Sequence, residues 1–174
     1  MEEPYRRQMT SYRRTRSAIL EGTKRLVATV GLQRTNMIDI ADTSEVSRAT
    51  LYNHFRDKSS VLRAVLESEI ERIFLVVDSE MSPVAGLARI AREISSDPAL
   101  EMMRKSDAGM LAQLLVQQED TLWEQVETGL NKLLSDEGLA TIAKLWLVGQ
   151  VLQPLGVDQC QDQAEVIVSR KIDN

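Results

Sequence analysis

Two short stretches between residues 36 and 58 each show the spacing of an α-helix with one buried face, and only a few residues separate them. Their small or apolar positions are Met37, Ile40, Ala41 and Ser44, then Ala49, Leu51, Tyr52 and Phe55. Neither stretch is long enough to be stable alone. Ser47 precedes the second stretch and is a good N-cap, because its hydroxyl oxygen can accept from exposed amides of the next turn. The pattern predicts a helix-turn-helix.

The second of these helices carries a polar face opposite its apolar face. Its donors and acceptors are Arg48, Thr50, Asn53 and His54. Such a face suits a recognition helix in the major groove of DNA. Arg48 is the candidate for reading a base, since a guanidinium can bond guanine bidentately, which is worth about 1 to 3 kcal/mol of discrimination. Ala49 and Thr50 are short enough to let the helix lie close and touch a thymine methyl group.

The same residues resemble the signature of the TetR (tetracycline-repressor) family of bacterial one-component regulators. The matching positions are Ile40-Ala41, Ser44, Val46-Ser47, Leu51-Tyr52, His54-Phe55 and Lys58. Glu45 departs from the signature, since the family usually has glycine there. If the turn needs a left-handed backbone at Glu45, the Cβ atom costs roughly 1 to 2 kcal/mol. The specific match covers the motif and its neighbouring helices, and the rest of the chain follows the family in helix plan alone.

The resemblance implies an all-α protein with a three-helix DNA-binding domain and a C-terminal domain for ligand binding and dimerisation. It implies a transcriptional regulator, most simply a repressor, that binds a palindromic operator as a homodimer and is released by a small molecule. By resemblance, Asn36 and Met37 approach the DNA backbone, and Tyr52, Asn53, His54 and Lys58 bond phosphates. The DNA-binding prediction therefore comprises Asn36, Met37, Ser47, Arg48, Ala49, Thr50, Tyr52, Asn53, His54 and Lys58.

Positive charge gathers at the N-terminal end of an acidic chain. Residues 1–58 hold 11 Lys and Arg against 7 Asp and Glu, whereas the remainder holds 10 against 19. Because phosphate attraction acts over a Debye length of roughly 10 Å, a basic end can bind DNA although the net charge is −5. We expect a basic flexible arm over residues 1–14, the helix-turn-helix domain over 15–58 and a regulatory domain over 59–174. The arm has no helical apolar stripe, and both DNA contact and a solvated tail are open for it.

The C-terminal part is predicted to be wholly helical, because no alternating strand pattern of useful length occurs in it. A helix from Lys58 to about Asp78 is long enough to connect the two domains, and in the family this helix carries the ligand signal. Candidates to line an effector cavity are Phe74, Met102, Met103, Met110, Trp123 and Trp146. The alternative for each of them is ordinary core packing.

The segment from Leu139 to Leu155 is apolar nearly all round, so another surface must cover its outer side. In the family the last two long helices pair with their copies in a second subunit. The predicted dimer interface comprises Trp146, Val151, Leu152, Val166 and Ile167. A monomer that buries this helix centrally is the alternative.

Other functions have little support in the composition. The chain has one histidine and one cysteine, so we expect no catalytic triad, no metal site and no cofactor. No apolar run approaches the roughly 20 residues of a membrane span, and no signal peptide opens the sequence, which predicts a cytoplasmic protein. A small helical enzyme and a ligand-independent helix-turn-helix adaptor are the alternatives to a DNA-binding regulator.

Overall fold

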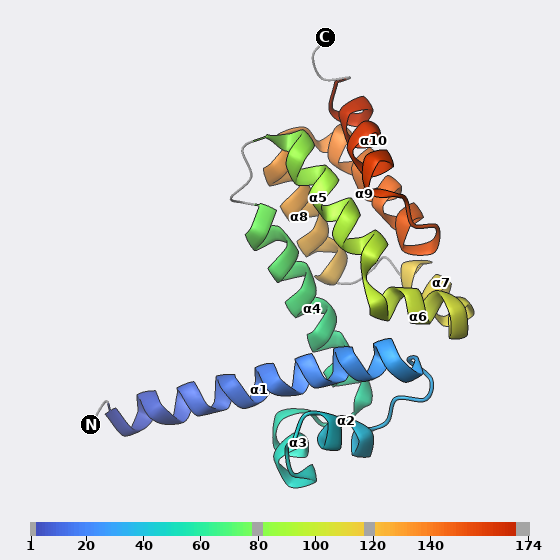
Figure 1. Ribbon diagram of the computed structural model, residues 1–174. Helices are drawn as coiled ribbons and strands as arrows, with labels where there is room; N and C mark the ends of the chain where they lie inside the picture. The colour runs from blue at the N-terminus through green and yellow to red at the C-terminus, as the bar shows by residue number, and fades with distance from the viewer. Residues whose placement is uncertain (1–2, 78–81, 117–120, 170–174) are drawn as a thin grey trace. The chain divides into compact units, whose positions relative to one another are not determined.

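The computed structural model describes residues 3–77, 82–116 and 121–169, and all regular secondary structure in these ranges is helical (Figure 1). The helices are α1 (Glu3–Val30), α2 (Met37–Thr43), α3 (Arg48–His54), α4 (Lys58–Val77), α5 (Pro83–Ser96), α6 (Pro98–Ser106), α7 (Ala108–Val116), α8 (Thr121–Leu134), α9 (Glu137–Leu152) and α10 (Val157–Ser169). The all-α prediction is therefore confirmed. In the described ranges, no helix combines the length and apolar character that crossing a lipid bilayer requires.

The chain divides into two compact units, Met1–Ser68 and Glu69–Asn174. The predicted boundary lies ten residues earlier, after Lys58. The difference arises because the first turns of α4 belong to the core of the first unit, where Val61 is fully buried and Ala64 is 4% exposed. The first unit therefore uses the start of a fourth helix in addition to the three that the sequence predicts.

The first unit packs α1, α2, α3 and the start of α4 around one small hydrophobic core. Its buried residues are Ile19, Leu20, Leu26, Ile40, Ala41, Leu51, Phe55, Val61 and Ala64. Helix α1 ends where the sequence predicts, because Gly31 adopts a left-handed backbone with φ of 86°. The Gly31 amide donates to the Val27 carbonyl at 2.9 Å, which satisfies one of the last carbonyls of the helix.

Residues 3–14 are helical, which corrects the prediction of a flexible arm over residues 1–14. They form the first turns of α1, and the first two residues of the chain lie outside the described ranges. The arm was predicted from the missing apolar stripe. Arginine, glutamine and methionine are nevertheless strong helix formers, and Pro4 lies in the first turn, where proline is tolerated. Propensity and continuity with the packed part of α1 therefore decide the local structure.

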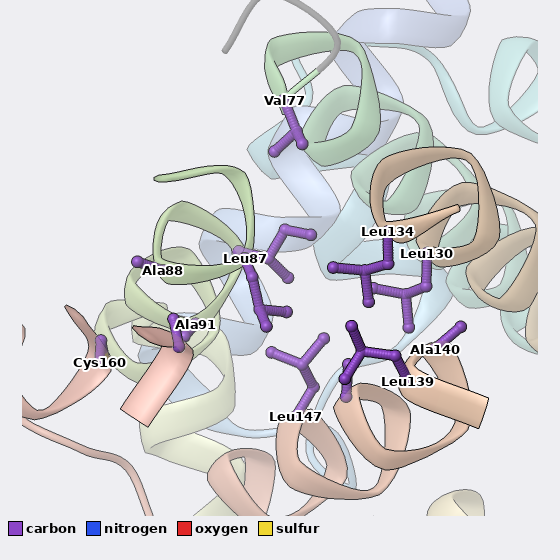
Figure 2. Close-up of a cluster of buried hydrophobic side chains, with 13 residues drawn as sticks. Val77, Leu87, Ala88, Ala91, Leu130, Leu134, Leu139, Ala140, Leu147 and Cys160 are labelled. Carbon is purple, nitrogen blue, oxygen red and sulfur yellow. The ribbon is translucent and has the colours of Figure 1, made fainter. Parts of the chain in front are cut away.

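The second unit buries a separate core of leucine and alanine side chains from α5, α8, α9 and α10. Figure 2 shows Leu87, Leu130, Leu134, Leu139 and Leu147 converging on its centre, with Cys160 of α10 beside Ala91 of α5. Ser82, Asp97 and Asp136 cap α5, α6 and α9 with their side-chain oxygens. The long helical pattern predicted after Asp107 is described as α7 and α8, with residues 117–120 outside the described ranges.

Ion pairs join α4 to α5 within the second unit. The Arg72 Nη2 atom lies 3.0 Å from a carboxylate oxygen of Glu69 and 3.0 Å from one of Glu93, and Arg89 also binds Glu93. Burial raises the pKa of the Glu93 carboxyl, but hydrogen bonds and charge attraction from Arg72 and Arg89 outweigh burial and lower its pKa below the ordinary value. Arg72 thereby fixes the second half of α4 against the second unit.

Candidate nucleic-acid interface

Helix α2 is fixed at both ends by side chains. The Asn36 Oδ1 atom accepts from the amides of Ile38 and Asp39, each at 3.0 Å, so the predicted N-cap is confirmed. The Asn36 Nδ2 atom donates to the Asp39 carboxylate at 2.7 Å. At the other end, Arg25 of α1 donates to the Thr43 carbonyl at 3.1 Å. The Asn36 side chain is therefore used in capping α2.

The turn between α2 and α3 contains a left-handed residue. Glu45 has φ of 55°, at the position where the resemblance led us to expect glycine. The turn is closed by backbone hydrogen bonds from Glu45 to Asp42 at 3.2 Å and from Val46 to Ala41 at 3.0 Å. These bonds hold the left-handed geometry although a Cβ atom is present. The strain expected from Glu45 therefore lies in the turn that orients α3.

Helix α3 begins with the predicted cap at Ser47. Its Oγ atom accepts from the Thr50 amide at 3.0 Å and lies 2.8 Å from the Thr50 hydroxyl oxygen. Leu51 is fully buried and Phe55 is 6% exposed, so these two residues anchor α3 in the core. The helix-turn-helix prediction is confirmed by this arrangement of α2, turn and α3.

The opposite side of α3 is exposed. The exposed residues there are Ser47, Arg48, Ala49, Tyr52 and Asn53, with Thr50 half-buried. The helical spacing of the sequence predicts that Ala49 and Tyr52 belong to the buried face of this helix. That prediction is wrong, because Ala49 is exposed and the Tyr52 side chain is 55% exposed. A seven-residue helix anchored by Leu51 and Phe55 has little room for further core residues. The result is a wider outward face than the sequence pattern indicated.

His54 is engaged by α1. Its ring stacks on Tyr12, with ring centroids 4.2 Å apart and an interplanar angle of 27°. Burial, followed by the nearby charge of Arg16, lowers the pKa of His54 below the ordinary histidine value. The Nδ1 atom is buried and has no hydrogen-bond partner among the described residues. His54 therefore packs against α1, a contact that the sequence pattern does not indicate.

Two other residues of the predicted DNA-binding set have structural contacts. The Lys58 Nζ atom donates to the Leu32 carbonyl at 2.7 Å and to the Gln33 carbonyl at 3.4 Å, so its charge holds the loop after α1. Met37 packs against the core of the first unit. No sequence pattern indicates the Lys58 contact, because it joins residues far apart in the chain.

The six residues predicted to line a cavity lie on several helices of the second unit. Phe74 and Trp146 pack against its core, and the Trp146 indole donates to Gln163 at 2.7 Å. Met103 is buried, Met102 and Trp123 are half-buried, and Met110 is 36% exposed. For Phe74, Met103 and Trp146, core packing is thus the observed environment.

One side of α9 carries exposed apolar residues. Ile142, Leu145 and Leu152 are 49%, 58% and 48% exposed, and Gly149 lies between them on the same side. Of the other predicted interface residues, Val166 on α10 is 64% exposed, Val151 is half-buried and Ile167 packs partly into the core. The predicted interface did not include Ile142 and Leu145, although positions three, seven and ten residues after Ile142 lie on the same face of a helix and would have indicated this stripe.

The first unit holds a capped helix-turn-helix whose second helix exposes a polar face, and it lies in the basic part of the chain. This is the architecture of helix-turn-helix DNA-binding domains. Residues 19–65 match the family of bacterial regulatory proteins described as the tetR family. This part of the chain is therefore similar to the DNA-binding domain of the TetR family, as the resemblance implied. The match covers the first unit, from the packed part of α1 to the start of α4.

Two curated regulators are similar to part of the chain. The HTH-type transcriptional regulator TtgR of Pseudomonas putida is 35% identical over 63 residues, which are 36% of this chain and 30% of that protein. The probable HTH-type transcriptional regulator ArpR of Pseudomonas putida matches with the same identity and coverage. The alignment thus spans less than a third of each curated relative.

Solved structures match along most of the chain. The TetR family repressor AlkX from Dietzia sp. strain DQ12-45-1b matches with a TM-score of 0.61 and 20% identity, over 89% of this chain and 94% of AlkX. The regulator FadR from Bacillus subtilis, solved in complex with stearoyl-CoA, matches with a TM-score of 0.54 and 16% identity, over 88% of this chain and 97% of FadR. At these identities the matches show a shared fold alone.

Proposed function

We propose that this protein is a cytoplasmic transcriptional regulator, most simply a repressor, that binds a palindromic DNA operator as a homodimer. The observation that carries the proposal is the exposed face of α3, which presents Arg48, Ala49, Tyr52 and Asn53 while Leu51 and Phe55 anchor the helix. The basic character of residues 1–58 supports DNA as the partner. The description of TtgR as a transcriptional regulator and of AlkX as a repressor agrees with it.

The exposed residues of α3 divide into those that read bases and those that hold the backbone. Arg48, in the first turn of α3, would donate to a guanine in the major groove. Ala49 and Thr50 would lie against bases at short range. Tyr52 and Asn53 would bond phosphates and set the register of the helix. His54, Lys58 and Met37 would act indirectly, because their contacts hold α3, α1 and α2 in place.

A homodimer would cover the exposed apolar stripe of α9. Ile142, Leu145 and Leu152 form one edge of this helix, and Val166 adds apolar surface on α10. A two-fold interface built from these residues would present two recognition helices to half-sites one DNA turn, about 34 Å, apart. Operator symmetry follows from this arrangement.

A small molecule bound in the second unit would release the protein from DNA. The predicted lining residues remain candidates where they are only half-buried, as for Met102 and Trp123. The structure of FadR holds stearoyl-CoA, which supports an apolar or acyl-bearing effector for a protein with this fold. In the proposal, ligand binding changes the position of α4 and thereby the separation of the two recognition helices.

The test is a selection of bound duplexes from random double-stranded DNA with the full chain. We expect enrichment of an inverted repeat whose half-site centres are one helical turn apart. Enrichment of a single asymmetric site would contradict the dimer in the proposal. Failure to enrich any duplex at low salt would overturn DNA binding itself and leave an adaptor or an enzyme.

A further inference from the structure

Helix α1 extends well beyond the core that it helps to build. Its first buried core residue is Ile19, yet the helix begins at Glu3. The part between Glu3 and Arg16 contains five arginines, Arg6, Arg7, Arg13, Arg14 and Arg16, and a single acidic residue. Among the side chains of this part that the structure describes, none belongs to the buried core, so core packing does not account for these arginines.

Two ring contacts dock this extension on α3. Tyr12 stacks on His54 at 4.2 Å between ring centroids, and the Arg16 guanidinium lies 5.5 Å from the centroid of the Phe55 ring. Tyr12 and Arg16 are four residues apart, so both lie on the side of α1 that faces α3. His54 is the last residue of α3, and Phe55 follows it. The extension is thus attached at the C-terminal end of the recognition helix.

Three further arginines are exposed beside this contact. Arg6 and Arg13 are seven residues apart and share one face of α1, while Arg14 lies further round the helix. Arg13 and Arg14 form no ion pair within the described part of the chain. Neighbouring arginines of the same charge repel one another, and a polyanion would remove that repulsion.

We propose that the N-terminal extension of α1, residues 6–16, is a second DNA-contacting surface that binds phosphates of the duplex next to the half-site occupied by α3. The proposal rests on the function proposed above and adds a contact that the helix-turn-helix does not supply. Arginine guanidinium groups bind phosphate oxygens without reading sequence, so the extension adds affinity and salt dependence but no base preference. Docking through Tyr12 and His54 places these charges as a fixed helix.

The test measures binding by fluorescence anisotropy over a series of NaCl concentrations, with the selected operator duplex and a scrambled duplex of equal length. The variant Arg13→Gln/Arg14→Gln keeps helix propensity and removes two charges. The matched control, Arg92→Gln/Lys105→Gln, removes two charges from the second unit. For the Arg13 and Arg14 variant we expect the slope of log Kobs against log[NaCl] to become shallower by about 0.9 for each phosphate that it no longer binds. Its operator preference should stay unchanged, and the control should match the wild type.

Three results decide the proposal. If the wild-type protein binds the operator duplex and the Arg13→Gln/Arg14→Gln variant shows the same salt slope, the proposed phosphate contact of the extension is overturned and the proposed function stays intact. A wild type that binds neither duplex would overturn the proposed function itself. An equally shallow slope in the Arg92→Gln/Lys105→Gln control would also overturn phosphate binding by the extension, because net charge alone would then explain the effect.

A second pair of variants tests the docking. Tyr12→Ala removes the stacked ring but keeps every arginine, and we expect it to reduce the salt slope in part. Tyr12→Phe keeps the ring and removes only the hydroxyl, so we expect the wild-type slope. A wild-type slope in Tyr12→Ala would contradict a docked helix and favour a mobile tail.

Discussion

Ser44, in the turn of the helix-turn-helix, packs directly against the backbone of Gly22 in α1. A Cβ atom on Gly22 would lie 2.2 Å from the Ser44 Oγ atom and 2.9 Å from the Ser44 Cα atom. Ser44 is the C-cap of α2 and is 7% exposed. The Oγ atom could rotate away, but the Cα atom is fixed in the backbone. The orientation of α2 and α3 on α1 therefore depends on glycine at position 22.

We expect Gly22→Ala to destabilise the first unit. Overpacking costs typically about 1 to 3 kcal/mol, which exceeds the gain of up to about 1 kcal/mol from replacing a helical glycine by alanine. Chemical denaturation followed by circular dichroism measures the change in unfolding free energy. The control is Gly109→Ala in α7, where a Cβ atom would meet nothing within 4 Å. A Gly22→Ala variant as stable as the wild type would show that the turn can move away from α1.

Glu45 in the turn carries strain that glycine would relieve. Its φ of 55° costs a residue with a Cβ atom roughly 1 to 2 kcal/mol, partly offset by the greater freedom of glycine in the unfolded chain. We predict that Glu45→Gly raises the unfolding free energy by about 0.5 to 1 kcal/mol. Glu45→Ala keeps the Cβ atom and should bring no such gain. Equal effects of both substitutions would assign the change to removal of the carboxylate.

Local features of this protein could be predicted from its sequence, and long-range contacts could not. The caps at Asn36 and Ser47 and the stop at Gly31 depend on residues within a few positions, so they were predicted correctly. The contacts of His54 with Tyr12 and of Lys58 with Leu32 join distant residues, and no local pattern encodes them. The predicted phosphate contacts of these two side chains stay predictions.

The sole histidine makes the stability of the fold depend on pH. The pKa of His54 is lowered in the folded protein by burial and by Arg16, so the unfolded chain binds the proton more readily. The contribution of neutral His54 is present above the ordinary pKa of about 6.5 and is lost as pH falls through the lowered folded-state pKa. We expect the unfolding free energy to fall as pH drops below about 6.5.

The matched variant is His54→Phe, which keeps an aromatic ring on Tyr12 but cannot take up a proton. Denaturation curves of both proteins between about pH 5 and pH 8 isolate the histidine contribution. The difference between the two proteins should grow as pH falls. Two results would show that His54 does not cause the pH dependence of the unfolding free energy. One is the same pH dependence in both proteins, and the other is an NMR titration that gives His54 an ordinary or raised pKa.

If the proposed homodimer pairs through the exposed stripe of α9, a charge placed in this stripe should separate the two subunits. Leu145→Asp places a charge at the middle of the stripe, where the side chain is 58% exposed and carries little of the fold of its own chain. We predict a monomer by sedimentation velocity with an unchanged helical content. Leu75→Asp on α4, at a side chain that is 74% exposed, is the control and should stay dimeric. A Leu145→Asp protein that sediments as a dimer would place the interface elsewhere.

Arg48→Ala tests whether the outward face of α3 reads the bases of DNA. Binding of wild type and variant to the selected operator and to a scrambled duplex is measured at one salt concentration. We expect the ratio of the two affinities to fall by about 5- to 150-fold per half-site, the equivalent of about 1 to 3 kcal/mol, while binding to the scrambled duplex persists. An equal loss of affinity for both duplexes would contradict base reading by α3, because Arg48 would then contact only phosphates.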